Sequence, residues 1–345
     1  MKLIIDCDPG NAVPGANVDD GLAIALAVAA RDRLDLLAIT IVAGNTPNRI
    51  GYAAAQTLLG HFDVDVPLYL GADRALVEDP TRWRAHLDRG ARDATVANLW
   101  EDTPRPQPFR TAPAMPAAQA IGELVAAHPG EVTIVAIGPL TNIALALRLY
   151  PDLAKDVGRI VIMGGVFDVD GYLVDTNFGF DPEAAAIVLG SGAAVTLIPL
   201  DVSTRTMLVH EDLDRLERID SRLTRYLIPT LRPWVTYSAA TRNIPGTWIH
   251  DVVAVALLLD PTIVTSRSRA VTVELAPGPT RGRASRWTPG SLATHGDPRA
   301  VEPAPIDVLE GIDNTRLLDL ITDSFAAASG PISRRSAGTR PVPAE

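Results

Sequence analysis

The sequence of 345 residues has little of several features that mark whole classes of protein. Its single cysteine, Cys7, excludes a disulfide framework and a metal cluster held by thiolates. Its 31 lysine and arginine residues are outnumbered by 41 acidic residues, and the net charge of −10 argues against a general nucleic-acid binder. No apolar run approaches the roughly 20 residues of a membrane span, and Met1-Lys2 leads into a strand-like run without a secretory signal pattern. We therefore expect a soluble, cytoplasmic protein with no nucleic-acid or membrane partner.

The main pattern that is present is a series of short apolar runs separated by helix-length segments. The runs are apolar on both faces and predict buried parallel strands at 3–5, 36–42, 132–137, 160–163 and 195–199. The segments between them predict helices at 19–30, 48–60, 116–127 and 182–190. This alternation predicts an α/β fold with a doubly wound, mostly parallel central sheet flanked by helices.

Two stretches interrupt this pattern. Residues 73–115 carry charges, prolines and tryptophans without a clear period, and we expect a long surface excursion there. Residues 211–227 are expected to be helical, and the chain up to residue 250 is then expected to be irregular and rich in aromatic side chains. One or two late strands are expected within 265–306, the clearer of them at 270–275.

The sequence shows no internal repeat and no convincing linker. We therefore expect a single catalytic domain over residues 1–329. The tail over residues 330–345 is rich in proline, serine and arginine and is expected to be disordered.

Four aspartates gather around the end of the first predicted strand. Asp6 and Asp8 share a face of that strand, and ligands of parallel α/β sheets bind beyond the carboxyl ends of the strands. Asp19 and Asp20 open the next predicted helix, where carboxylates meet its positive end. Taken singly, each has a structural explanation as a helix cap or a satisfied core carboxylate. Together they would repel one another unless a cation lay between them, and an all-oxygen ligand set favours Ca²⁺ or Mg²⁺ over Zn²⁺.

These residues resemble the N-terminal signature of the inosine-uridine nucleoside hydrolase family, whose usual form is D-x-D-P-G-x-D-D. Here Asp6-Cys-Asp-Pro-Gly10 is followed by Asp19-Asp20. Further motifs follow in the family's order: Val42-Ala-Gly-Asn45, Ile137-Gly-Pro-Leu-Thr-Asn142, Met163-Gly-Gly165, Asn177 with Asp181-Pro-Glu-Ala-Ala185, and His250-Asp251. Any one of these motifs would be a weak signal, but the ordered set over residues 3 to 260 is specific.

The resemblance implies a calcium-dependent hydrolase that cleaves the N-glycosidic bond of a ribonucleoside and releases free base and ribose. It implies one Ca²⁺ bound by Asp8, Asp20, the backbone carbonyl of Ile137 and Asp251, a set of oxygens that suits calcium. It also assigns Asp8 as the general base. An aspartate of ordinary pKa is a weak base, so the bound metal would have to supply much of the activation of the water.

The resemblance places Asp19, Asn45, Asp175 and Asn177 around the ribose hydroxyls. His250 matches the residue that helps to protonate the leaving base in purine-cleaving relatives, which favours purines or mixed specificity; a lone histidine is otherwise more often structural.

Three aromatic residues, Trp234, Tyr237 and Trp248, lie just upstream of His250 and could stack on the base. Packing in the core or at an interface explains them as well.

Two departures from the family pattern bear on the substrate. Eight residues, 11–18, stand where the family has one, and they include the turn pair Pro14-Gly15, which would let the segment loop out and reshape the pocket mouth. Asp175 replaces the usual glutamate, and its shorter side chain need not reach the same hydroxyl. The asparagine that is usual in the preceding loop is not evident in residues 167–171.

Two alternative functions stay open at this point. A haloacid dehalogenase-like, Mg²⁺-dependent phosphohydrolase also carries Asp-x-Asp after its first strand, but it expects a later catalytic lysine, and this chain has only Lys2 and Lys155. A non-catalytic nucleoside-binding relative would keep the calcium pocket, although the intact Asp8 argues against it. The resemblance further implies a small-molecule nucleoside substrate, a role in nucleoside salvage, and a homodimer or homotetramer.

Overall fold

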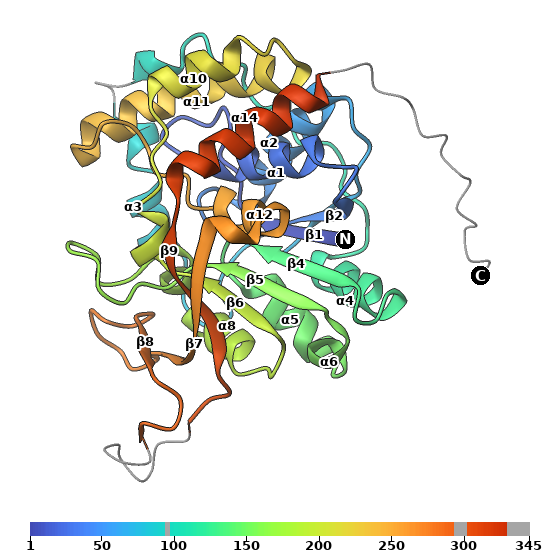
Figure 1. The fold of residues 1–345 in the computed structure, drawn as a ribbon, viewed down its shortest axis with the longest axis vertical. Coiled ribbons are helices and arrows are strands. Elements are labelled where there is room, and N and C mark those ends of the chain that lie inside the picture. Colours follow the sequence, from blue (N-terminus) through green and yellow to red (C-terminus); the bar gives the residue numbers. More distant parts are fainter. Residues whose placement is uncertain (94–96, 293–301, 330–345) are drawn as a thin grey trace.

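A nine-stranded sheet organises the computed structural model, which describes residues 1–93, 97–292 and 302–329 (Figure 1). The strand order is β3-β2-β1-β4-β5-β6-β9-β7-β8, and all neighbours pair in parallel except β9 with β7 and β7 with β8. The strands are β1 (Lys2–Cys7), β2 (Asp35–Ile41), β3 (Leu68–Leu70), β4 (Val132–Ala136), β5 (Arg159–Met163), β6 (Val195–Ile198), β7 (Val264–Val273), β8 (Ala284–Trp287) and β9 (Ile306–Ile312). The predicted fold class is thereby confirmed.

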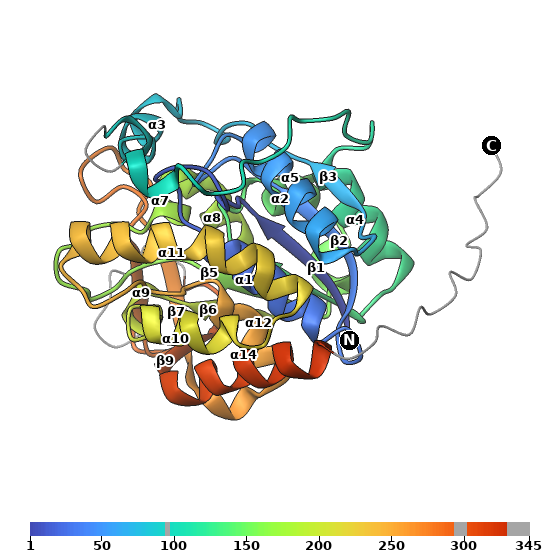
Figure 2. The same cartoon turned by 90° about the horizontal axis from the view of Figure 1, so that it is seen from above.

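Helices cover both faces of this sheet (Figures 1 and 2). On one face lie α1 (Asp19–Ala29), α2 (Asn48–Phe62), α10 (His210–Glu217), α11 (Arg222–Arg242), α12 (Val252–Leu259) and α14 (Asn314–Ala328). On the other face lie α4 (Ala117–Ala127), α5 (Thr141–Leu149), α6 (Leu153–Asp156) and α8 (Pro182–Leu189). The short elements are α3 (Thr81–Leu87), α7 (Thr176–Phe180), α9 (Leu200–Ser203) and the 3-10 helices η1 (Gly90–Arg92), η2 (Ala97–Trp100) and η3 (Pro261–Ile263).

The sheet separates two apolar cores, which explains why its central strands are apolar on both faces. In β1, Leu3 and Ile5 pack into the core beneath α1 and α12, whereas Ile4 packs into the core beneath α4 and α5. Side chains alternate along a strand, so a strand buried on both sides has no polar face to show. The polar residues therefore gather at the strand ends, where the chain leaves the sheet.

Helix α11 differs from the sequence-based expectation. It does not become irregular after residue 227 but continues to Arg242, although Pro229 and Pro233 lie inside it. Proline removes a helical hydrogen bond and predicts a break. Here the buried face of the helix, which includes Leu231 and Val235, packs into the core and holds it together. As a consequence Trp234 and Tyr237 lie on a regular helix rather than in a loop.

The other irregular stretches contain more structure than expected. Residues 73–115 include α3, η1 and η2, and the late strands are β7 and β8. Strand β9, which no pattern indicated, lies between β6 and β7 in the sheet. The predicted tail over 330–345 lies outside the described residues. None of the helices in the described part of the chain is both long and apolar enough to cross a membrane.

Candidate active site

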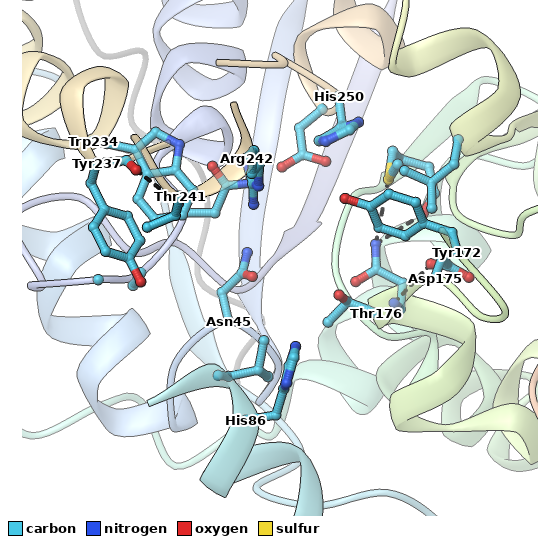
Figure 3. Close-up of a pocket in the computed structure, with 18 of the residues that line it drawn as sticks. Asn45, His86, Tyr172, Asp175, Thr176, Trp234, Tyr237, Thr241, Arg242 and His250 are labelled. Atoms are coloured by element: carbon cyan, nitrogen blue, oxygen red, sulfur yellow. Dashed lines mark hydrogen bonds between the residues drawn. The ribbon is translucent and has the colours of Figure 1, made fainter. Parts of the chain in front are cut away.

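A cavity of about 390 Å³ opens at the carboxyl ends of the parallel strands (Figure 3). Eight of the residues predicted for the site line it: Asn45, Ile137, Asp175, Asn177, Trp234, Tyr237, His250 and Asp251. The buried carboxylates of Asp8, Asp19 and Asp20 lie directly behind Asn45 and Asp251, to which they are hydrogen bonded. In Figure 3 the aromatic residues of α11 face Tyr172 and Asp175 across the cavity.

Four carboxylates from three segments meet at the bottom of this cavity. Asp8 follows β1, Asp19 and Asp20 form the first turn of α1, and Asp251 directly precedes α12. Oxygen atoms of Asp19, Asp20 and Asp251 lie within 4.8 Å of one another. The backbone N–H of Asp8 donates to Asp20 Oδ1 (3.0 Å), and that of Asp251 donates to Asp19 Oδ2 (3.2 Å).

The electrostatics of this cluster favour the binding of a cation. Burial raises the pKa of Asp8 and the pKa of Asp19 to about 6. Burial, followed by repulsion from neighbouring carboxylates, raises the pKa of Asp20 and of Asp251 well above the usual range. Within the described residues, Asp19 Oδ1 is buried without a hydrogen-bond partner. Buried carboxylates of this kind are stable when they bind a cation, and their oxygen donors fit a divalent ion such as Ca²⁺ or Mg²⁺.

The loop after β2 fixes the orientation of Asp8. Asn45 donates its backbone N–H to Asp8 Oδ2 (2.6 Å), and its Nδ2 lies 3.3 Å from Asp8 Oδ1 and 3.4 Å from Asp20 Oδ2. A Cβ atom on Gly44 would lie 1.8 Å from Asp8 Oδ2, so only glycine allows this approach. Asn45 therefore joins two of the carboxylates and still borders the cavity.

The opposite wall is formed around α7. Asn177 Nδ2 donates to the carbonyl oxygens of Ile137 (3.1 Å) and Met163 (3.0 Å), which ties the ends of β4 and β5 together. Asp175 caps α7 and accepts hydrogen bonds from the backbone N–H groups of Gly165 (2.7 Å), Asn177 (2.8 Å) and Phe178 (3.3 Å). Burial raises the pKa of Asp175 to about 6 in spite of these donors. The Asp175 carboxylate is thus held by backbone N–H groups of α7 and of Gly165, which is a structural role that its position in the sequence did not reveal.

His250 lies beside the carboxylate cluster and is almost completely buried. Its Nδ1 is 2.8 Å from Ser203 Oγ, at the end of α9. Burial, and then the nearby charge of Arg242, lower the pKa of His250 to about 3, so the ring is neutral at physiological pH. A neutral imidazole has one N–H donor and one acceptor nitrogen, so the ring can hydrogen bond to Ser203 and to a ligand at the same time.

The three aromatic residues differ in their relation to the cavity. Trp234 and Tyr237 line it, and Trp234 Nε1 donates to Thr247 Oγ1 (3.0 Å). Trp248 is not part of the lining; its ring packs near those of Tyr172 (6.2 Å) and His250 (5.7 Å). Stacking on a base stays a prediction for all three.

Asp6 does not share the cavity with Asp8. Its Oδ1 accepts hydrogen bonds from Thr40 Oγ1 (2.6 Å) and Asn142 Nδ2 (2.8 Å), and the residue is fully buried in the sheet. Burial raises the pKa of Asp6 to about 7. The sequence left two explanations for Asp6, a member of the metal site and a carboxylate of the core. Its position in the structure is that of a core carboxylate.

The inserted segment 11–18 is largely packed against the protein rather than looped out into solvent. Asn11 is buried, and its Nδ2 donates to Thr230 Oγ1 of α11 (3.2 Å). Gly15, Ala16 and Asn17 line the cavity. A Cβ on Gly90 would meet Gly15 Cα at 2.9 Å, so the insertion also contacts the excursion after β3. The segment therefore forms part of the cavity wall.

Several lining residues carried no sequence signal. They are His86, Leu87 and Arg89 from the excursion after β3, Tyr172 and Thr176 near α7, and Thr241 and Arg242 at the end of α11. None belongs to a motif with fixed spacing. They reach the cavity only through tertiary packing, which periodicity and motif spacing do not report.

A mostly parallel α/β sheet with a buried acidic cluster beneath a cavity at its carboxyl edge defines a metal-using enzyme that acts on a small molecule. Comparison with known proteins specifies the family. Residues 3–319 match the sequence model of the inosine-uridine preferring nucleoside hydrolases. The chain is 34% identical over 330 residues to the non-specific ribonucleoside hydrolase RihC of Salmonella enteritidis, covering 95% of this chain and 98% of that protein.

Solved structures agree with this match. A plant nucleoside hydrolase, PpNRh1, superposes with a TM-score of 0.80 at 28% identity, covering 96% of this chain and 99% of that one. A purine-preferring ribonucleoside hydrolase from Gardnerella vaginalis superposes with a TM-score of 0.78 at 29% identity, covering 95% and 99%. The chain belongs to the inosine-uridine preferring nucleoside hydrolase family, whose members are hydrolases that act on N-glycosyl bonds. This assignment removes the phosphohydrolase alternative.

Proposed function

We propose that this enzyme hydrolyses the N-glycosidic bond of ribonucleosides in a calcium-dependent reaction that gives free base and ribose. The observation that carries the proposal is the cluster of Asp8, Asp19, Asp20 and Asp251 beneath a cavity of about 390 Å³. That volume lies within the range of small-molecule sites. We further propose residues 1–329 as one catalytic unit.

Asp8 is the proposed general base. Its two oxygens are oriented by Asn45, and burial raises its pKa toward neutrality. A base whose pKa lies near the working pH removes a proton from water more effectively. In this mechanism water forms a bond to C1′, Asp8 takes the water proton, and the electron pair of the C1′–N bond leaves with the base. The proton on Asp8 returns to solvent after the sugar departs.

Metal binding is assigned to Asp8, Asp20, Asp251 and the carbonyl oxygen of Ile137, as the family resemblance implies. A divalent cation held there would supply positive charge that binds ribose hydroxyls and lowers the pKa of a water molecule. The all-oxygen donors and the absence of cysteine from this cluster support Ca²⁺ over Zn²⁺.

The remaining predicted residues would orient the substrate. The proposed ligands of the ribose hydroxyls are Asp19, Asn45, Asp175 and Asn177. Of these, Asn45, Asp175 and Asn177 line the cavity, and Asp175 also caps α7. His250, which lines the cavity, is the residue proposed to help protonate the leaving base, and the aromatic side chains of α11 are proposed to stack on that base. The names of the relatives, non-specific in one case and purine-preferring in another, support mixed or purine specificity.

A nucleoside panel tests this proposal. Inosine, guanosine, adenosine, uridine and cytidine are incubated with the enzyme, and the released reducing sugar is measured before and after chelation. We expect cleavage of at least one nucleoside, loss of that cleavage in EDTA, and recovery with Ca²⁺.

Other outcomes would replace the proposal. If no nucleoside is cleaved while one of them still raises the melting temperature, the protein is a nucleoside-binding relative without activity. Recovery with Mg²⁺ and not with Ca²⁺ would overturn the choice of metal.

We also propose a homodimer or homotetramer that acts in cytoplasmic nucleoside salvage, in keeping with its family. Light scattering of the purified protein tests the oligomeric state.

A further inference from the structure

Arg242 places a positive charge at the end of the cavity where we propose that the base binds. It is the last residue of α11 and lines the cavity close to His250 (Figure 3). Its guanidinium carbon lies 5.2 Å from the ring centroid of Trp234 and 5.4 Å from that of Trp248. The two indole rings that were expected to stack on the base therefore contact a cation.

The guanidinium is not neutralised by an adjacent carboxylate. Within residues 1–93, 97–292 and 302–329 it has one hydrogen bond, donated by Nη1 to Ser238 Oγ (3.0 Å), and no ion pair. Arginine carries five N–H donors and stays charged at all physiological pH values. Burying half of an arginine without a paired carboxylate costs free energy of folding. A ligand that accepts hydrogen bonds from its remaining N–H donors and faces its charge would recover part of that cost.

The chemistry of the reaction needs a positive charge at this end. When the C1′–N bond breaks, its electron pair stays on the nitrogen of the base, and a purine or pyrimidine anion is a poor leaving group. Donors aimed at the position where charge develops stabilise the transition state more than the ground state. The carboxylate cluster cannot serve this purpose, because its charge has the wrong sign.

We propose that Arg242 is a catalytic residue that binds the departing nucleobase and stabilises its developing negative charge. This inference rests on the proposed N-glycosidic hydrolysis. Water adds to C1′ and loses its proton to Asp8, the C1′–N bond breaks, and the base leaves as an anion against the guanidinium. The anion then takes a proton that solvent supplies and that His250 is proposed to help deliver, so that nucleoside and water give ribose and neutral base.

A competing explanation is that Arg242 only balances the acidic cluster, since its charge also lowers the pKa of Asp19. The two explanations differ in their dependence on the leaving group. A group that stabilises the leaving base matters for nucleosides and little for a riboside whose leaving group is already stable as an anion. A counter-charge for the cluster would affect both substrates equally.

The test compares inosine and uridine with 4-nitrophenyl β-D-ribofuranoside in wild-type enzyme and in Arg242→Gln. We expect kcat/KM for the nucleosides to fall about 100-fold or more, as for the loss of a transition-state donor, while the nitrophenyl riboside changes only a few-fold. Arg242→Lys keeps the charge and should recover part of the nucleoside activity. Arg232→Gln is the matched control, because Arg232 lies on the same helix and pairs with Asp214 and Glu217 on the surface.

The contrary results are distinct. An equal loss on both kinds of substrate would overturn the leaving-group role and favour the counter-charge. Unchanged nucleoside activity in Arg242→Gln would also overturn it. If this variant does not fold, Arg242→Lys decides in the same way, by a nucleoside-specific or a uniform loss. Should the wild-type enzyme cleave neither substrate, the proposed function itself falls.

Discussion

Asp8 is held on both carboxylate oxygens by one residue, Asn45, and is closely approached by Gly44. A side chain fixed in this way loses little conformational freedom during the reaction, which is the benefit of preorganisation. The same contacts make position 8 sensitive to substitution by an amide, because both carboxylate oxygens of Asp8 face N–H donors. An amide at this place would point one N–H group at another.

Asp8→Asn should therefore lose most of its turnover and keep its fold. We expect kcat to fall by a factor on the order of 10² to 10⁴, because the amide cannot take a proton from water. Stability is checked by thermal melting, and metal affinity, which should weaken, by calorimetry. Asp35→Asn, at an exposed carboxylate of β2, is the control. Near-normal turnover in Asp8→Asn would show that another group removes the proton.

The aspartates of the site could be predicted because each belongs to a short motif at a strand end or a helix start. Asp19, Asp20 and Asp251 are indeed brought together by the fold. Arg242 could not be predicted, since arginine is common on surfaces and no spacing links it to the cluster. The cap made by Asp175 was also hidden, because it depends on how the chain turns between Gly165 and α7.

At the scale of elements, α3 is joined to the loop after β2 by the side chain of Arg84, besides the packing of Trp83 near Ala43. The guanidinium of Arg84 donates to the carbonyl oxygens of Gly44 and Asn45, and its charge offsets part of the rise that burial causes in the pKa of Asp8. None of the residues of α3 is fully buried, and its apolar packing includes the partly buried Trp83 against Ala43, Ala75 and Phe180. Arg84 therefore positions both the cavity wall and the loop that orients Asp8.

Arg84→Ala should loosen α3 and the loop after β2 without unfolding the sheet. Loss of hydrogen bonds from a charged donor costs about 1.5–3 kcal/mol, so we expect kcat/KM to fall about tenfold or more. Faster amide hydrogen exchange over residues 81–90 should accompany the loss, with little change in melting temperature. Arg82→Ala, at an exposed position of the same helix, should show neither effect. Unaltered exchange in Arg84→Ala would remove the positioning role.

Most central strands and their helices could be predicted from the alternation of apolar runs, because burial on both faces leaves a clear pattern. The full length of α11 could not, since Pro229 and Pro233 predict a break that core packing overrides. The place of β9 between β6 and β7 was equally hidden, because no pattern indicated the strand and local sequence does not report the neighbours of a strand. Local sequence thus predicts elements more readily than their order in space.

At the scale of the whole molecule, the buried carboxylates reverse the usual effect of acid on stability. Asp8, Asp19 and Asp175 have a folded-state pKa of about 6, well above the ordinary value of about 3.9. In the window between these values the folded state binds more protons than the unfolded state. Their contribution to stability is therefore complete below the unfolded pKa and is lost as the pH rises through the folded pKa.

The metal-free enzyme should thus melt at a higher temperature near pH 5.5 than near pH 7.5, because the several raised carboxylates outweigh the single histidine, His250, whose lowered pKa acts in the opposite direction. Added Ca²⁺ should raise the melting temperature most at the higher pH, where the carboxylates are ionised. Differential scanning calorimetry in EDTA and in Ca²⁺ measures both effects. Asp19→Asn should reduce both the pH effect and the Ca²⁺ effect on the melting temperature. The exposed Asp220 has a pKa lowered by Arg225, so this residue changes the stability only at lower pH. A metal-free enzyme that melts lower at pH 5.5 would contradict this account.

The position of β9 has a consequence for the synthesis of the chain. Strand β9 pairs with β6 on one side and with β7 on the other. About 110 residues of the sequence lie between the end of β6 and the start of β9. At the usual 5–20 residues per second, the ribosome needs about 5–20 s to make that interval. During this time β6 presents an unpaired edge to the nascent chain's surroundings, an edge that can pair with the wrong partner. The growing polypeptide thus depends on its last strand to close the sheet, and slow elongation over residues 199–305 would prolong its exposure to misassembly.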